Sequence, residues 1–204
     1  NFVQDEYIIV LDKEPIRSSS EFEIQLVQRR IENFVSKVQE LKGKVLETFS
    51  HALVGLHVQL NPEDVALLKE DVEVKFIEKN GLVFLHEGNS SLRSWGLDRI
   101  DQIDLPLDDL YITPYTFTGK TAHAYVVDTG IRETHEDFYG RLGTGFSAMD
   151  DGSSPYEDCN GHGTHVAGTV GGTSSGVAKG SMLHAVRVFG CGGSTTWAII
   201  LKGL

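Results

Sequence analysis

The stretch from Asn160 to Thr169, Asn-Gly-His-Gly-Thr-His-Val-Ala-Gly-Thr, constrains the fold more than any other part of this sequence. Glycines on both sides of His162 allow backbone or a ligand to come close to that side chain. The small and apolar residues that follow suit a helix packed tightly against a sheet. The stretch therefore predicts that His162 begins a buried helix at the rim of a cleft. A histidine in a glycine-rich turn is the simpler alternative for so short a motif.

A short apolar segment upstream, residues 122–127, predicts a buried strand. The segment is rich in β-formers and ends in Asp128, Thr129 and Gly130, which puts an acid at its C-terminal end. In open α/β sheets, ligands bind at the edge formed by these strand ends. An aspartate in this position can also simply cap the following turn.

Taken together, the Asp128 and His162 stretches resemble the aspartate and histidine motifs of the subtilisin-like serine proteases (subtilases), in which the aspartate comes first in the chain. The resemblance implies that His162 is the general base, since an imidazole can exchange a proton near neutral pH. It implies that Asp128 accepts the other ring N–H and holds the tautomer. A metal site made by Asp128, His162 and His165 is an alternative, because histidines three apart share a helix face.

The same resemblance implies a serine nucleophile in a later glycine-rich motif, and this sequence has no serine in that context after His162. The oxyanion-hole asparagine of subtilases is also expected beyond Leu204. We therefore expect the N-terminal piece of a serine endopeptidase, without activity of its own. The alternative is a non-catalytic inhibitor, a binding protein or a truncated pseudoprotease. The serines that come too soon are Ser174, Ser175, Ser181 and Ser194.

The two cysteines, Cys159 and Cys191, are either free buried thiols or a disulfide. In the proteinase K-like branch of the subtilases, and in the aqualysin type in particular, extracellular members carry a disulfide at this pair of positions. The resemblance therefore implies a Cys159–Cys191 bond and a secreted protein. Such a bond would rigidify the loop before His162 and be worth roughly 3 kcal/mol.

Residues 1–87 predict a separate small domain with the element order β-α-β-β-α-β, a ferredoxin-like sandwich. Ser20 and Glu23 would form a capping box at the first helix, and His51 and His57 would face solvent. Strands are predicted at residues 7–11, 45–49, 52–60 and 72–79, and helices from Glu21 to Gly43 and from Pro62 onward.

Placed before a subtilase segment, this domain resembles the subtilase inhibitor propeptide of the I9 type. In that family the propeptide packs on two helices of the catalytic domain, assists its folding and leaves its tail in the cleft as a product-like strand. The resemblance implies a tail at residues 80–87, with self-cleavage between about residues 85 and 89. The tail side chains expected to fill pockets are Leu82, Val83, Phe84 and Leu85.

The expected fold class is thus α/β. A ferredoxin-like α+β domain at residues 1–87 is followed, at residues 88–204, by the N-terminal part of a subtilisin-like, doubly wound parallel sheet. Helical structure is expected again from Thr195 to Leu204.

The segment that begins at Trp95 resembles the start of a mature proteinase K-like enzyme and is rich in side-chain oxygens. An acidic loop of this kind commonly just faces water. The alternative is structural calcium, which takes about six to eight oxygen ligands. Some bacterial members of this branch bind calcium here, although Leu110 stands where a polar ligand is expected. The matching positions are Asp98, Asp101, Gln102 and Asp108. No cofactor is expected for catalysis.

The formal net charge of −11 argues against nucleic acid or an anionic membrane as a partner. No apolar run approaches the ~18 residues that span a bilayer. No basic-then-apolar leader begins the chain, so we expect a secretory signal to be absent or already removed. The expected partners are protein or peptide substrates and the chain's own propeptide, in an extracellular setting.

Overall fold

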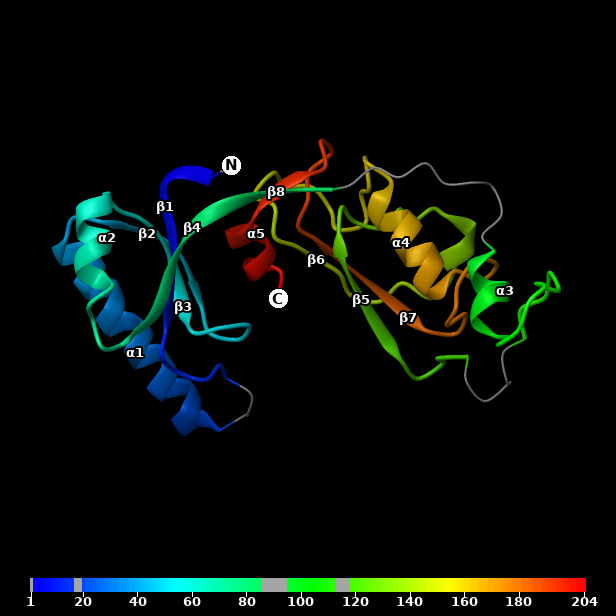
Figure 1. Ribbon diagram of the computed structural model, residues 1–204, viewed down its shortest axis with the longest axis horizontal. Coiled ribbons are helices and arrows are strands. Elements are labelled where there is room, and N and C mark those ends of the chain that lie inside the picture. The colour runs from blue at the N-terminus through cyan, green and yellow to red at the C-terminus, as the bar shows by residue number, and fades with distance from the viewer. Residues whose placement is uncertain (1, 17–19, 86–94, 113–117) are drawn as a thin grey trace. The chain divides into compact units, whose positions relative to one another are not determined.

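The computed structural model describes residues 2–16, 20–85, 95–112 and 118–204 (Figure 1). The chain forms two compact units. The first comprises Asn1–Val83, Thr195–Lys202 and Leu204, and the second comprises Phe84–Ser194 and Gly203.

The first unit is built on a sheet with the strand order β2-β3-β1-β4-β8. The pairs β1–β3, β1–β4 and β2–β3 are antiparallel. This order and direction confirm the predicted ferredoxin-like topology. In chain order its elements are β1 (Phe2–Leu11), α1 (Glu21–Glu40), β2 (Lys44–Phe49), β3 (Gly55–Gln59), α2 (Pro62–Leu68), β4 (Val74–Phe84), β8 (Ser194–Thr196) and α5 (Trp197–Lys202).

Strand β1 is buried on both faces, which explains its continuous apolar sequence. Tyr7, Ile9 and Leu11 join the core formed with the apolar faces of α1 and α2. Ile8 and Val10 point the other way, into a smaller cluster with Phe49 of β2 and Ala198 of α5. Successive side chains of a strand alternate between faces, so five consecutive apolar residues can serve two layers.

The helices of the first unit follow their sequence signals with one exception. The apolar residues that recur every three or four positions along α1 are buried: Val27, Ile31, Phe34 and Val38. Asn61 caps α2 by accepting a hydrogen bond from the Asp64 amide, with Pro62 in the first turn. The exception is α1, where Ser20 occupies the predicted N-cap position but its side chain does not accept the hydrogen bond expected from the first turn.

Strand β4 is longer than predicted, because it runs through Asn80 to Phe84 instead of ending at Lys79. The reason is that β8, more than a hundred residues later, lies next to β4 and supplies hydrogen-bonding partners. Ser194–Thr196 form this strand, so α5 begins at Trp197 and not at Thr195. Asn80 and Gly81 are buried within β4.

The prediction that His57 faces solvent is also wrong. Its side chain is 12% exposed, and its Nε2 lies 2.8 Å from Glu6 Oε2. Asn80 Nδ2 lies 3.2 Å from the same ring nitrogen. The continuation of β4 brings Asn80 to the ring, which could not be foreseen from a strand ending at Lys79. His51 is exposed, as predicted.

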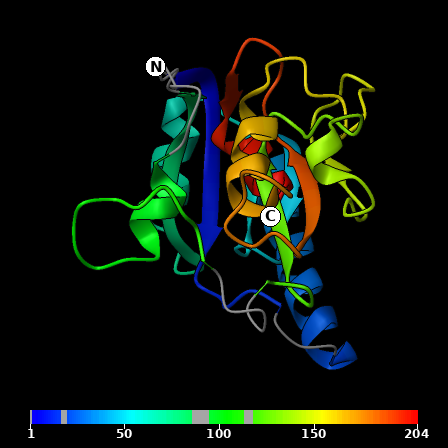
Figure 2. The same cartoon turned by 90° about the vertical axis from the view of Figure 1, so that its right-hand side faces the viewer.

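The second unit contains a parallel sheet with the order β5-β7-β6. Helix α4 packs on it, and Figures 1 and 2 show α4 alongside β5 and β7. Ala167 of α4 is fully buried against Val126 and Leu183. The elements are α3 (Gly96–Ile100), β5 (His123–Asp128), the 3-10 turn η1 (Glu136–Phe138), β6 (Phe146–Ser147), α4 (His162–Gly171) and β7 (Met182–Arg187).

The prediction that His162 begins a closely packed helix is confirmed. Helix α4 starts at His162, and its N-cap Gly161 has the positive φ of 94° that favours glycine. A Cβ built on Gly163 would lie 2.2 Å from the Gly130 carbonyl oxygen. Only a glycine therefore lets the start of the helix touch the turn after β5.

Candidate active site

Asp128 and His162 meet where the end of β5 faces the start of α4. The His162 Nδ1 lies 2.8 Å from Asp128 Oδ1 and 2.9 Å from Oδ2. Because an ionised carboxylate only accepts hydrogen bonds, Nδ1 carries the proton and Nε2 keeps its lone pair. Asp128 is buried, whereas the His162 side chain is 36% exposed. The arrangement can take up a proton at Nε2 while the carboxylate stabilises the resulting cation.

Strand β5 holds Asp128 through its main chain. The Asp128 carbonyl accepts hydrogen bonds from the Val188 and Phe189 amides, at 2.8 and 3.3 Å, just after β7. The Thr129 amide donates to Asp128 Oδ1 at 2.7 Å. These contacts fix both the end of the strand and the rotamer of the carboxylate.

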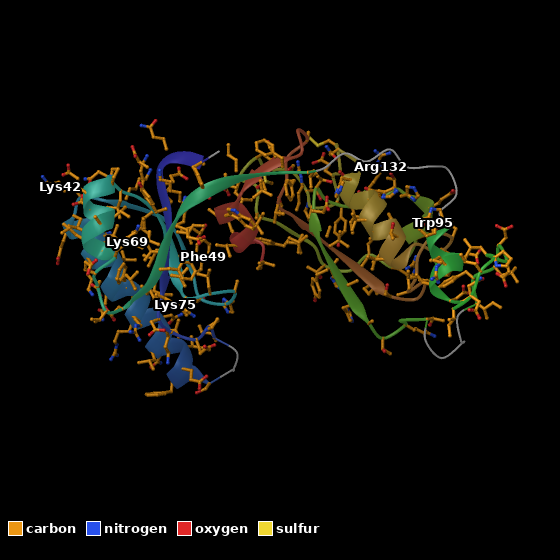
Figure 3. All side chains as sticks on the ribbon, viewed as in Figure 1. Lys42, Phe49, Lys69, Lys75, Trp95 and Arg132 are labelled. Atoms are coloured by element: carbon orange, nitrogen blue, oxygen red, sulfur yellow. A yellow bond between two sulfur atoms is a disulfide. The ribbon has the colours of Figure 1, made fainter. Side chains whose placement is uncertain are left out.

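A second buried carboxylate, Asp158, was not singled out from the sequence. Its pKa is lowered: burial alone would raise it, but hydrogen bonds from Thr164, Gly161 and Thr129 outweigh burial. Thr164 in turn accepts a hydrogen bond from the backbone amide of Arg132, the residue labelled in Figure 3. A signal existed in the spacing, since Asp158 lies three residues before the N-cap Gly161, but it required knowing where the helix begins.

The disulfide expected between Cys159 and Cys191 is present, with a Cα–Cα distance of 5.2 Å. It joins the loop before α4 to the loop after β7. Asn160 reinforces the link, because its Nδ2 donates to the Cys191 carbonyl and its Oδ1 accepts from the His162 amide. The backbone that carries His162 is therefore anchored to residues 190–193.

The expected tail reaches the same loop. The Leu85 amide donates a hydrogen bond to the Gly193 carbonyl at 3.0 Å. A Cβ on Gly193 would lie 3.6 Å from Leu85 and 3.5 Å from Asn160 Nδ2. Leu85 thus lies beside the loop that is bonded to Cys159. Residues 86–94, which include most of the expected cleavage region, lie outside the described residues.

The polar side chains of the segment after Trp95 form hydrogen bonds with backbone groups of the same segment. Asp98 accepts from the amides of Asp108 and Asp109, and Asp101 accepts from that of Ile112. Asp108 accepts from the Leu110 amide, while Gln102 donates its amide to the carbonyls of Asp104 and Pro106. Within residues 2–16, 20–85, 95–112 and 118–204, no group of three or more His, Cys, Asp or Glu side chains could hold a metal. In this arrangement the carboxylates of Asp98, Asp101 and Asp108 accept hydrogen bonds from backbone amides.

Asp128, His162 and His165, all of which are described, do not form such a group. His165 is exposed on α4. Asp137, in η1, is another buried carboxylate of this unit. Burial by itself would raise the pKa of Asp137, but hydrogen bonds from Ser174 and Ser175 outweigh it and lower the pKa to about 2.

The two parts of the chain match two families. Residues 6–86 match the peptidase inhibitor I9 family, and residues 120–204 match the subtilase family. The chain therefore carries an inhibitor I9 domain ahead of the N-terminal part of a subtilase-family domain.

Particular relatives agree with this class. The chain is 48% identical over 162 residues to the extracellular serine proteinase of Thermus sp. (strain Rt41A), covering 79% of this chain and 38% of that protein. It is 37% identical over 207 residues to alkaline serine exoprotease A of Vibrio alginolyticus, covering 99% of this chain and 38% of that protein. The chain thus spans well under half the length of these relatives.

A solved structure gives the same result. The crystal structure of a cold adapted subtilisin-like serine proteinase is 49% identical in sequence, with a TM-score of 0.50. The similarity covers 55% of this chain and 40% of that one. Among the described residues, no helix is long and apolar enough to cross a membrane.

Proposed function

We propose that the chain is the inhibitor domain and the first part of the catalytic domain of a secreted serine endopeptidase precursor. The observation that carries the proposal is the hydrogen bond from His162 Nδ1 to the buried Asp128 carboxylate. It leaves Nε2 as the basic atom of an imidazole at a helix start. No catalytic cofactor is needed for this chemistry.

In the proposed reaction, His162 Nε2 removes the proton from a serine hydroxyl as that oxygen attacks a peptide carbonyl. The imidazolium is stabilised by Asp128 and then gives the proton to the leaving amine. The serine and the oxyanion-hole side chain would lie beyond Leu204. The 204-residue chain alone is then expected to bind but not to cleave.

We propose that residues 1–87 inhibit and assist the domain formed by residues 88–204. Two contacts between these segments support the proposal. Ile8, Val10 and Phe49 bury an apolar surface against Ala198 of α5, which belongs to the catalytic part of the chain in this proposal. The Leu85 amide binds Gly193 in the loop anchored to Cys159, as expected for a tail lying along the substrate path. Cleavage between about residues 85 and 89 would convert that tail into a bound product.

The test is expression of the natural reading frame through its stop codon, with His162→Ala compared with wild type. His165→Ala is the matched control, since His165 is exposed one turn further along the same helix. We expect His162→Ala to lower peptide hydrolysis and self-cleavage by about 10⁴-fold or more. Retained self-cleavage in cis would contradict the role of His162 as base.

The alternative is a non-catalytic inhibitor or pseudoprotease. A stop codon directly after Leu204, together with tight inhibition of an active subtilase by the 204-residue chain, would favour it. Under the main proposal this chain should not react with a serine-directed fluorophosphonate, and labelling would reveal a nucleophile elsewhere.

Calcium binding by Asp98, Asp101, Gln102 and Asp108 remains a prediction for the longer protein. It would require these side chains to leave the backbone amides that they now bind. Calorimetric titration with calcium tests it, and an unchanged thermal midpoint on addition of a chelator would count against it.

A further inference from the structure

Asp158 is a buried carboxylate that accepts five hydrogen bonds. The residue is 6% exposed. Oδ1 accepts from Thr129 Oγ1 at 2.8 Å, from the Gly161 amide at 2.8 Å and from the Asn160 amide at 3.2 Å. Oδ2 accepts from both the amide and the hydroxyl of Thr164. An ionised carboxylate suits these five contacts because it only accepts hydrogen bonds, and with about four lone-pair directions at least one of them is shared by two donors.

Through Thr129, Asp158 is connected to both members of the Asp128–His162 pair. The Thr129 hydroxyl has one proton, which it donates to Asp158. Its oxygen is thereby oriented to accept from the Gly163 amide at 2.8 Å. Thr129 directly follows Asp128, and Gly163 directly follows His162. One hydroxyl, oriented by Asp158, therefore ties the end of β5 to the start of α4.

Asp158 also caps the helix that carries His162. The N-cap residue Gly161 has no side chain with which to cap the first turn. Asp158 instead accepts from the Gly161 amide and from the Thr164 amide, the third residue of the helix. A negative charge at this end of the ten-residue helix is favourable as well. The position of His162 as the first helical residue thus depends on a side chain outside the helix.

We propose that Asp158 is a positioning residue for the catalytic pair: it holds the start of α4 against the end of β5 so that His162 Nδ1 reaches Asp128. This inference rests on the proposed function of that pair. An asparagine at residue 158 would fit the space, but its NH₂ group would face either Thr164 or the Thr129 side. At least one set of donors would then lose its acceptor.

Asp137 provides a matched comparison within the same unit. It is as buried as Asp158, and it accepts from the Ser174 amide, the Ser174 hydroxyl and the Ser175 hydroxyl. These donors follow the C-terminal end of α4, whereas those of Asp158 lie at its N-terminal end. Asp137→Asn therefore removes a similar buried network from the same helix without touching the His162 loop.

The test is proton NMR of the His162 Nδ1–H in the 204-residue chain, for wild type, Asp158→Asn and Asp137→Asn. In wild type we expect a resolved downfield signal that exchanges slowly with water. Asp137→Asn should keep its chemical shift, although the chain becomes less stable. Asp158→Asn should shift the signal and exchange it at least about tenfold faster, because the hydrogen bond to Asp128 opens more often.

An unchanged His162 signal in folded Asp158→Asn would overturn the proposal, and so would equal loss of the signal in both variants. If Asp158→Asn does not fold, Thr129→Val takes its place, since it removes the linking hydroxyl and leaves the carboxylate. The same tenfold criterion then applies. A missing signal in wild type would instead refute the Asp128–His162 pair itself, and with it the proposed function.

In the active longer enzyme, Asp158→Asn should lower kcat by about 10- to 100-fold with KM within about twofold. Asp137→Asn should leave kcat within about twofold below its melting temperature. A rise in KM with unchanged kcat would assign Asp158 to substrate binding and contradict a positioning role. Failure of the His162→Ala test described above is a separate result, because it concerns the base and not its support.

Discussion

Asp137→Asn should make the second unit less stable at neutral pH and leave its stability nearly unchanged at pH 2. Asp137 is held by hydrogen bonds from Ser174 and Ser175, and its pKa is lowered from 3.8 to about 2. A carboxyl group whose pKa is lower in the folded than in the unfolded chain stabilises the fold above the unfolded pKa. That contribution is lost as pH falls from about 4 through about 2.

The size of the effect follows from the pKa difference. Each pKa unit is worth about 1.4 kcal/mol, so lowering the pKa from 3.8 to about 2 corresponds to an upper limit of roughly 2.5 kcal/mol. Asp137 itself is 7% exposed, but the neighbouring Ser174 and Ser175 are exposed and admit solvent that weakens the interaction. We therefore expect Asp137→Asn to lower the free energy of unfolding by about 1–2 kcal/mol at pH 7.

The assay is urea unfolding at several pH values from 2 to 7, followed by NMR signals of α4 so that the second unit is read separately. Glu136→Gln is the control, because it makes the same charge change at the adjacent, exposed residue. It should change the unfolding free energy by less than about 0.5 kcal/mol at every pH. A cost of Asp137→Asn that is equal at pH 2 and pH 7 would refute the reasoning.

Two further predictions concern the first unit and the disulfide. Asn80→Ala should destabilise the first unit by about 2 kcal/mol in urea unfolding, because the buried side chain accepts from the Ala198 amide at 3.2 Å; the exposed Gln59→Ala should cost less than about 0.5 kcal/mol, and equal costs would contradict the prediction. Replacing both Cys159 and Cys191 by serine should lower the stability of the second unit by about 3–4 kcal/mol, given their separation of 32 residues; an unchanged thermal midpoint would show that the loop is held without the bond.

Much of the fold could be predicted because its signals are local. The apolar positions of α1 recur every three or four residues, and Phe34 and Val38 among them are fully buried. The capping residue Asn61 and the first-turn Pro62 predict the start of α2 from two adjacent residues. In each case the residues that decide the structure lie within one or two turns of each other.

The features that were missed depend on partners far apart in the chain. Strand β4 continues through Asn80 because β8 lies next to it, and nothing near Lys79 indicates that partner. His57 is largely covered because Glu6 and Asn80 contact its ring from two other strands. The secondary-structure propensity of nearby residues cannot predict such pairings, since they depend on tertiary contacts.

The candidate site divides in the same way. Asp128 and His162 could be named from the sequence, because each stands in a recognisable local setting of strand end or glycine-flanked helix start. Asp158 could not, because its donors come from two sides: Thr129 at the end of β5, and the amides at the start of α4. Its importance is visible only when these segments are seen to meet on one carboxylate.

The loop at residues 190–193 connects the backbone of His162 to Leu85. Its Cys191 is bonded to Cys159 and accepts from Asn160, whose Oδ1 in turn accepts from the His162 amide. Two residues on, the Gly193 carbonyl accepts from the Leu85 amide. A strand bound at Gly193 therefore contacts the same short loop that holds the backbone of His162 through Asn160. Both contacts depend on one segment that the disulfide closes, so reducing the disulfide should weaken the hydrogen bonds of Leu85 and of the His162 amide together. Disruption of the Asp158 hydrogen bonds should instead change the position of His162 alone.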